Sequence, residues 1–140
     1  MNAWSKRLIA VALGAMAGCS GGKAGTPTFP VEGRVEYQGK AATGAFVVFH
    51  PTQEQGGEVR PTGKVGEDGK FQLTSFDDLD GAPAGEYAVT VEWYKLVNKG
   101  SDWQRGPNVI PPKYGKADTT PIRVTIREGS NTLEPFQIVR

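Results

Sequence analysis

The chain contains very few of the residues from which redox, metal and acid–base sites are built. Its 140 residues include one cysteine, Cys19, and one histidine, His50. A disulfide within the chain or a Cys-rich zinc site needs further cysteines, and a single histidine excludes His-rich metal sites. The formal net charge is +1, with no block of one sign. Because nucleic-acid-binding proteins carry a basic patch, we expect no nucleic-acid partner. No cofactor is indicated.

The chain also lacks a hydrophobic run long enough to cross a membrane as a helix. Its longest apolar segment is LIAVALGAMAG, residues 8–18, about half of the roughly 20 residues that a spanning helix needs. Lys6 and Arg7 precede this segment, and no acidic residue accompanies them. A basic start followed by a short apolar run is typical of a secretory signal.

The four residues from Met16 to Cys19 resemble the lipobox of bacterial lipoproteins, in which small residues precede an invariant cysteine. Met16 departs from the Leu that is usual at its position. The resemblance implies that residues 1–18 are removed as a signal peptide and that diacylglycerol is attached to the Cys19 sulfur. Two or three acyl chains then give stable anchoring. Ser20 is not the Asp that retains many lipoproteins at the inner membrane, which favours the outer membrane, on its periplasmic face or at the cell surface.

The sequence divides into a tether and a folded part after the signal. Residues 19–29 are rich in Gly, Thr and Pro and show no periodicity, which predicts a flexible spacer. From residue 30 the pattern changes to short apolar alternations. We therefore expect one domain, residues 30–140.

The folded part reads as a succession of short strands with no helical period. Apolar residues alternate over 31–37 and 86–94, and 45–50 is a continuous apolar run, which predicts a central strand covered on both faces. GEDG at 66–69 predicts a hairpin turn. Pro135 predicts an edge position or a bulge for the last strand. About seven strands of this kind predict an all-β, antiparallel Greek-key β-sandwich.

Several segments together are similar to bacterial lipoprotein domains of the carboxypeptidase regulatory-like, transthyretin-like kind. They are VEGRVEYQGKAATGAFVVFHP, GEDGKFQLTSF, DGAPAGEYAVTVEW, IPPKYG and REGSNTLEPFQI, in this order. The resemblance covers nearly all of residues 30–140 and implies a transthyretin-like sandwich in which Gly85 and Tyr87 begin a long strand. It also implies a non-catalytic module.

Residues 95–120 include Pro111 and Pro112 and show no usable periodicity. They predict a long surface loop, and loops of this length often carry function. Four aromatic residues border or occupy the loop, and they are candidates for a platform that binds a glycan or an envelope protein: Trp93, Tyr94, Trp103 and Tyr114. The alternative is structural, with Trp93 in the core by strand parity and Tyr114 covering one end of the sandwich.

Two further groups are candidates for chemistry. Asp77, Asp78 and Asp80 form the densest carboxylate cluster and are a weak candidate for calcium, with solvated turn residues as the favoured interpretation. His50 would have to serve any hydrolase in this chain, but a histidine at a strand end is more often structural. We expect a non-enzymatic, lipid-anchored module of the cell envelope, with a carbohydrate-binding lipoprotein as the alternative and a His50 hydrolase as the least favoured.

Overall fold

A computed structural model describes residues 26–53 and 59–140 of the chain. The predicted signal peptide, Cys19 and the tether up to residue 25 lie outside the described residues. Backbone pairing begins at Phe29, whose N–H and C=O both bond to Ala82 at 2.9 Å.

The described residues form eleven short strands and one 3₁₀-helix. In chain order they are β1 (Val31–Tyr37), β2 (Lys40–Ala41), β3 (Phe46–Pro51), β4 (Thr62–Lys64), β5 (Lys70–Gln72), β6 (Gly85–Glu92), β7 (Tyr94–Lys99), β8 (Asp102–Asn108), η1 (Pro112–Gly115), β9 (Arg123–Ile126), β10 (Asn131–Thr132) and β11 (Phe136–Ile138).

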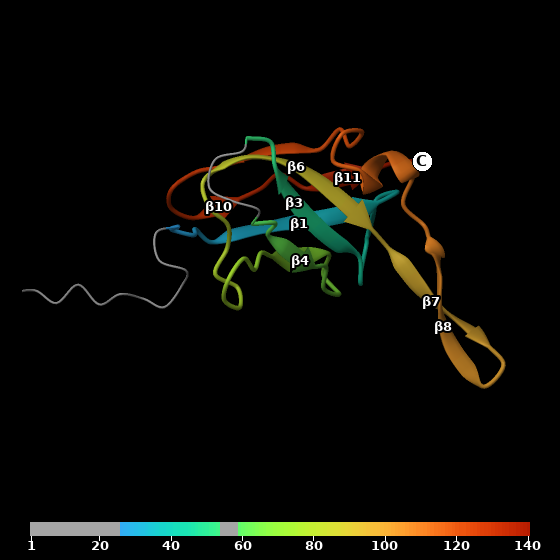
Figure 1. The fold of residues 1–140 in the computed structure, drawn as a ribbon. Helices are drawn as coiled ribbons and strands as arrows, with labels where there is room; N and C mark the ends of the chain where they lie inside the picture. The colour runs from blue at the N-terminus through green and yellow to red at the C-terminus, as the bar shows by residue number, and fades with distance from the viewer. Residues whose placement is uncertain (1–25, 54–58) are drawn as a thin grey trace, which may run out of the picture.

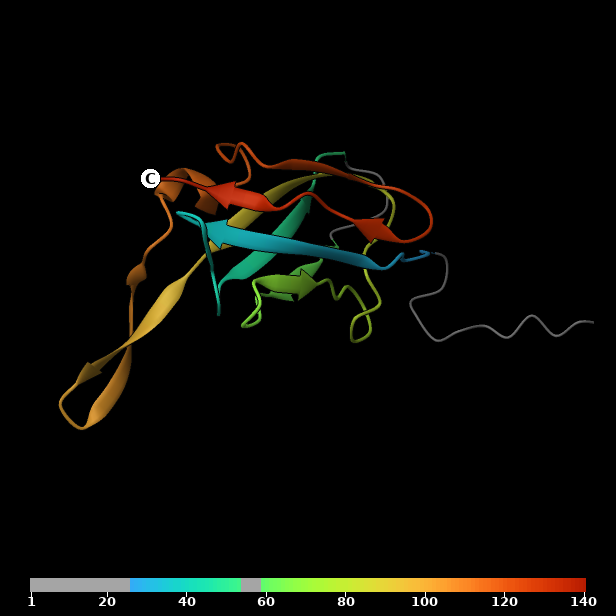
Figure 2. The same ribbon diagram turned by 180° about the vertical axis from the view of Figure 1, so that it is seen from behind.

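Two sheets make up the body of the molecule, and a third, two-stranded sheet projects from it (Figure 1). In the first sheet, β1 pairs with β2 and β5 in antiparallel fashion and with β10 and β11 in parallel. The second sheet is antiparallel, in the order β4-β3-β6-β9. The view from behind shows β1 crossing the strands of the second sheet (Figure 2). The predicted all-β sandwich is confirmed.

The parallel pairing of β1 departs from the antiparallel arrangement that we predicted. It arises because the chain leaves the second sheet at β9 and returns to the first at β10, instead of turning back within one sheet. A parallel pair requires such a crossover connection. The last strand, β11, begins directly after Pro135 and has β1 as its partner, which agrees with the predicted edge position.

Aromatic rings fill the space between the two sheets. Phe49 is fully buried, and its ring centroid lies 5.9 to 6.4 Å from those of Phe71, Tyr87 and Phe136. Phe71 packs over Gly33, its partner in the register, where a Cβ would lie 2.6 Å from the ring. A side chain at position 33 would displace this ring, so the glycine is a packing requirement.

β3 is buried on one face, not on both as predicted. Val47 and Phe49 point into the core, whereas Phe46 is 46% exposed. Phe46 lies on the opposite face of the sheet from Val47 and Phe49, so the apolar run 45–50 includes a largely exposed position. A continuous apolar run cannot by itself tell one buried face from two.

The predicted GEDG turn is present, and it connects the two sheets. Gly69 has a φ of +81°, and the Gly66 N–H donates to the Lys70 carbonyl oxygen. The strands on either side of the turn belong to different sheets: β4, before it, pairs with β3, and β5, after it, pairs with β1. A bridge between Thr62 of β4 and Thr74, just beyond β5, links the two segments again. The turn therefore closes one side of the sandwich.

Residues 95–120 are not the irregular loop that we predicted. Most of the segment forms β7, β8 and η1. Gly100 and Ser101 make a two-residue turn, and Gly100 has the positive φ, +79°, that such turns require. The hairpin has solvent on both faces, so its residues show no apolar alternation for a sequence pattern to reveal.

Candidate functional site: the β7–β8 arm

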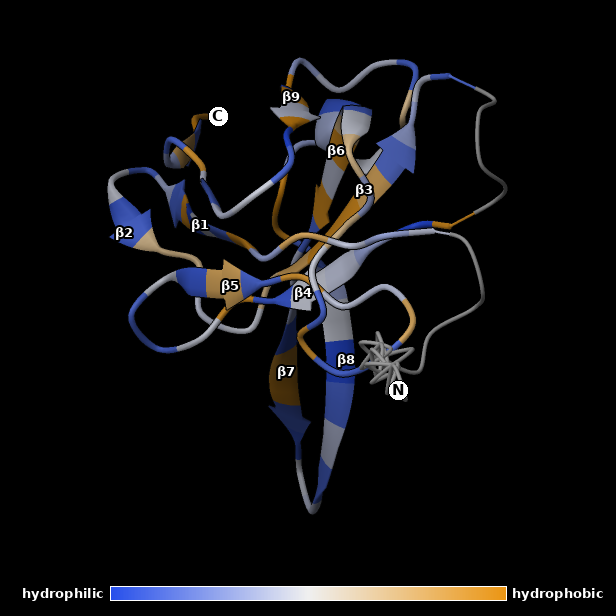
Figure 3. Ribbon diagram, turned by 90° about the vertical axis from the view of Figure 1, so that its left-hand side faces the viewer, coloured by the Kyte–Doolittle hydropathy of each residue, from blue (hydrophilic) through white to orange (hydrophobic). Residues whose placement is uncertain are grey.

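We call residues 94–108 the arm. Figure 3 shows this hairpin extending away from the body, with a mainly hydrophilic ribbon and a hydrophobic segment on β7. At its base, the Trp93 N–H donates to the Asn108 side-chain oxygen at 2.9 Å, and the Val109 N–H donates to the Trp93 carbonyl oxygen. These bonds join the arm firmly to the end of β6.

The register of the hairpin assigns its side chains to two faces. Leu96 pairs with Arg105, and Asn98 pairs with Trp103. Because side chains alternate along a strand, these four residues share one face. We call Leu96, Asn98, Trp103 and Arg105 the apolar face of the arm, and the opposite face carries Lys95, Val97, Lys99, Asp102 and Gln104.

The apolar face combines exposed hydrophobic area with a cation. Leu96 and Trp103 are each 66% exposed, the highest values among the exposed large hydrophobic side chains of the described residues. The Arg105 guanidinium carbon lies 3.5 Å from the centroid of the Tyr94 ring, which is a cation–π geometry. Trp, Tyr and Arg are the residue types that dominate binding energy at protein interfaces.

The four predicted aromatic residues do not form one platform. Tyr114 is 5% exposed and packs from η1 onto the core beside β6. Trp93 lies edge-on to Tyr37, with 6.1 Å between ring centroids, and Lys95 covers it at 4.3 Å. Tyr94 and Trp103 belong to the arm. Burial of Tyr114 thus contradicts its assignment to a binding platform and agrees with the structural alternative.

Sequence reasoning missed Leu96 and Arg105. The signal that locates them is the Gly100–Ser101 pair, because a two-residue turn fixes which residues face one another on either side. Counting back from this turn places Leu96 opposite Arg105.

The three aspartates occupy one loop but do not gather into a cation site. Asp80 is already satisfied, because its carboxylate accepts from the backbone N–H groups of Ser75, Phe76 and Asp77 at 2.7 to 3.1 Å. Asp77 and Asp78 are exposed. Over residues 26–53 and 59–140, no group of three or more His, Cys, Asp or Glu side chains is placed to hold a metal ion. Asp80 therefore acts as a structural acceptor within its loop.

His50 lies on the outer face of the second sheet. Its Nε2 is 2.9 Å from the Thr90 hydroxyl oxygen. Burial, with a smaller contribution from the positive charge of Arg60, lowers the pKa of His50 below its ordinary value. Thr90 is only 6% exposed, whereas a nucleophilic hydroxyl must reach a substrate. The contact therefore fits a structural pair.

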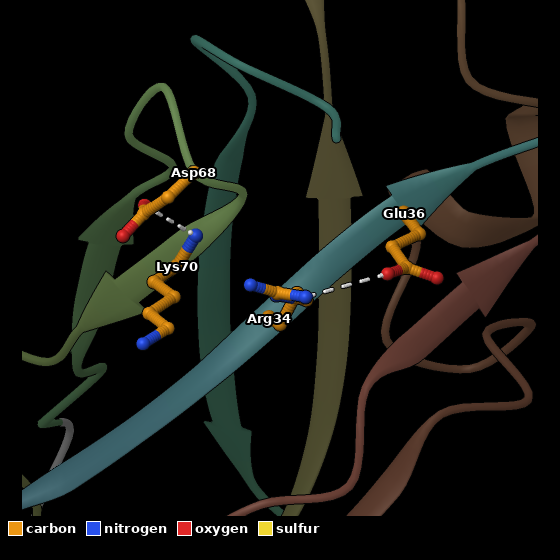
Figure 4. A network of polar contacts seen from close by, with 4 residues as sticks. All are labelled: Arg34, Glu36, Asp68 and Lys70. Atoms are coloured by element: carbon orange, nitrogen blue, oxygen red, sulfur yellow. Dashed lines mark hydrogen bonds and ion pairs between the residues drawn. The ribbon is translucent and has the colours of Figure 1, made fainter. Parts of the chain in front are cut away.

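An open groove of about 530 Å³ is lined by residues of β4 and β5 and of the turn between them. Its lining includes the exposed side chains of Phe46 and Leu79 together with charges of both signs. Figure 4 shows the neighbouring polar contacts, in which Arg34 pairs with Glu36 at 3.8 Å and the Lys70 N–H donates to Asp68 at 3.0 Å. The mixture of charges gives the groove no clear preference for one class of ligand.

In the part of the chain that the structure describes, no helix combines the length and the apolar character needed to span a bilayer. The chain matches no protein-family model, and comparisons with curated proteins and with solved structures find no match.

Proposed function

We propose that the protein is a lipid-anchored, non-enzymatic module of the cell envelope that acts by binding a protein partner through the apolar face of its arm. The observation that carries the proposal is the exposure of Leu96 and Trp103 on a hairpin that projects from the body. Singly exposed apolar residues are ordinary, but a Trp, a Leu and an Arg on one face of a projecting element mark an interaction surface.

The anchor part of the proposal rests on the sequence. Met16 to Cys19 resembles a lipobox, the preceding segment has the form of a signal, and residues 30–140 resemble the transthyretin-like domains of bacterial lipoproteins. Mass spectrometry of the mature N-terminal peptide should show a diacylglyceryl adduct on Cys19, and a Cys19→Ala variant should leave the membrane fraction. An intact, unmodified Met1 terminus would contradict the anchor.

The partner-binding part is tested by photo-crosslinking in cells. A photoreactive amino acid at Ser101, in the turn of the arm, should give a defined adduct. The same probe at exposed Glu128, which follows β9 of the body, should not. Trp103→Lys should abolish the Ser101 adduct, because the variant removes the exposed ring and puts an unpaired charge against the partner. Val139→Lys is the matched control, since Val139 is 62% exposed on the body. Equal adducts from positions 101 and 128, or none at all, would refute binding through the arm.

A glycan-binding platform is less well supported than a protein-binding face. Trp103 alone of the four aromatic residues is largely exposed, and the guanidinium of Arg105 already covers the Tyr94 ring. The arm therefore offers a sugar one open ring, while it offers a protein a mixed face of Leu, Trp, Asn and Arg.

A further inference from the structure

We infer that the partner bound by the arm is a second copy of this chain, and that the two copies pair through the free edges of their β8 strands. This inference rests on the proposed function and names its partner. It predicts a continuous four-stranded sheet, β7-β8 of one copy followed by β8-β7 of the other, related by a two-fold axis at Gln104.

The turn determines which backbone groups are free. In a hairpin with a two-residue loop, the flanking residues, here Lys99 and Asp102, form a hydrogen-bonded pair. Pairs then alternate along an antiparallel ladder, so Trp103 and Arg105 occupy non-hydrogen-bonded positions. Their N–H and C=O groups point away from β7, and within residues 26–53 and 59–140 no other strand pairs with this edge. Such an edge is a template for pairing with another strand.

The length of the open edge is limited by a bulge. The register shifts between Tyr94 and Leu96, where Gly106 and Pro107 of β8 lie opposite Lys95 alone. A bulge twists an edge away from further pairing, and proline has no N–H to donate. Because Gly106 and Pro107 are excluded, two β8 strands that pair about Gln104 are joined through residues 103–105.

Side-chain chemistry favours β8 over β7 as the joining edge. If two β7 strands paired in antiparallel fashion about Val97, Lys95 of each copy would face Lys99 of the other, and like charges directly opposite destabilise a sheet. If two β8 strands pair about Gln104, Trp103 of each copy faces Arg105 of the other. The Arg105 guanidinium lies over Tyr94 of its own copy on one side, so it would stack between two rings. Opposed Trp and Arg side chains attract through a cation–π contact, and the symmetry makes two such contacts per dimer.

Because the proposed lipid anchor holds the copies on one membrane, a small interface is enough for two arms to pair. A two-stranded hairpin is marginally stable by itself, and extension to four strands stabilises it. Copies held on one membrane surface meet at a high effective concentration, so a short strand pairing is populated there without a large buried area.

The two-fold axis gives a sharp test. Around it, Gln104 faces its own counterpart at a non-hydrogen-bonded position, where Cα atoms lie about 4.5 Å apart, within the range that a disulfide requires. In membranes from cells that express the full chain, mild oxidation of Gln104→Cys should give a disulfide-linked dimer. Val97→Cys, its partner across the hairpin, is the matched control for the other edge and should remain monomeric.

Arg105→Glu, added to Gln104→Cys, should reduce the dimer by about five- to tenfold, because two Trp–Arg contacts are lost together. Lys40→Glu, a charge change on an exposed strand of the body, should leave the dimer unchanged. Dimer yields from Gln104→Cys that are no higher than those from Val97→Cys would overturn the inference.

Failure of this inference is distinguishable from failure of the proposed function. A Ser101 photo-adduct of twice the mass of the chain supports both. An adduct that contains a different protein alone, with no Gln104→Cys dimer, supports binding through the arm and overturns the second copy as partner. No Ser101 adduct refutes the proposed function itself.

Discussion

The body and the arm use apolar residues in opposite ways. In the body, Phe49 and Leu73 are fully buried and contribute to one core, whereas in the arm Leu96 and Trp103 are each 66% exposed. Burial of a large apolar side chain stabilises a fold by about 1.5–3 kcal/mol, and the arm gains little of this. The stability of the fold therefore does not account for these exposed residues, which is why we propose that they bind a partner. The comparison can be tested position by position.

The largest expected effect is that of Phe49→Ala. The ring contacts Phe71, Tyr87 and Phe136 at the centre of the core, so its removal should lower the free energy of unfolding by about 3–5 kcal/mol. Leu96→Ala in the arm should change it by less than about 0.5 kcal/mol. Denaturant unfolding of both variants measures the difference, and equal losses would contradict the division between core and arm.

Gly81→Ala should have the next largest effect. Gly81 has a φ of +91°, and a Cβ there would lie 1.7 Å from the Phe29 carbonyl oxygen, which bonds to Ala82. The backbone must move and lose this pairing, at a cost of about 2–3 kcal/mol.

Gly129→Ala is the matched control for Gly81→Ala. Its φ is +93°, but among the described residues no heavy atom beyond its chain neighbours lies within 4 Å of the position that a Cβ would take, so only the strain of about 1–2 kcal/mol applies. Thermal unfolding of the two variants separates the steric contribution, and a Gly129→Ala loss as large as that of Gly81→Ala would show that the approach of Phe29 is unimportant.

Tyr87→Phe should have a smaller effect that depends on pH. The Tyr87 hydroxyl donates to the Pro83 carbonyl oxygen at 2.7 Å, and loss of this bond should cost about 0.5–1.5 kcal/mol. Burial raises the pKa of Tyr87 to about 12, from an ordinary value of 10.0. The unfolded chain therefore releases this proton first, and the contribution of Tyr87 to stability falls as pH rises from 10 to 12. Unfolding measured at pH 8 and pH 11 should show a smaller difference between wild type and Tyr87→Phe at pH 11.

The strands of the body could be predicted from the sequence because a strand with one buried face shows apolar and polar residues in alternation. The alternation over 31–37 and 86–94 places Val35 and Val89 in the core, and the Asp68–Gly69 pair predicts the turn that joins the two sheets. The parallel partners of β1 could not be predicted, because alternation identifies a strand but carries no information about the direction of its neighbour.

The arm could not be predicted in the same way because neither of its faces is buried. Its strands contain Lys95, Asn98 and Gln104 between the apolar residues, so no period of two emerges. The calcium candidate in the aspartate loop could not be judged from the sequence for a related reason. The sequence shows three carboxylates, but only the fold shows that backbone N–H groups already donate to both carboxylate oxygens of Asp80.

The variant with the smallest expected effect on stability, Trp103→Ala, also distinguishes a role in binding from a role in folding most clearly. Trp103 lies on the arm, and its ring is absent from the aromatic contacts of the core, so Trp103→Ala should change the free energy of unfolding by less than about 0.5 kcal/mol. The same variant should greatly reduce the Ser101 photo-adduct. Trp93→Ala is the informative counterpart, since Trp93 packs edge-on to Tyr37 at the base of the arm and its loss should destabilise the body measurably. A Trp103→Ala variant that unfolds as readily as Trp93→Ala would place Trp103 among the structural residues, and the exposed ring could then no longer be assigned to a partner.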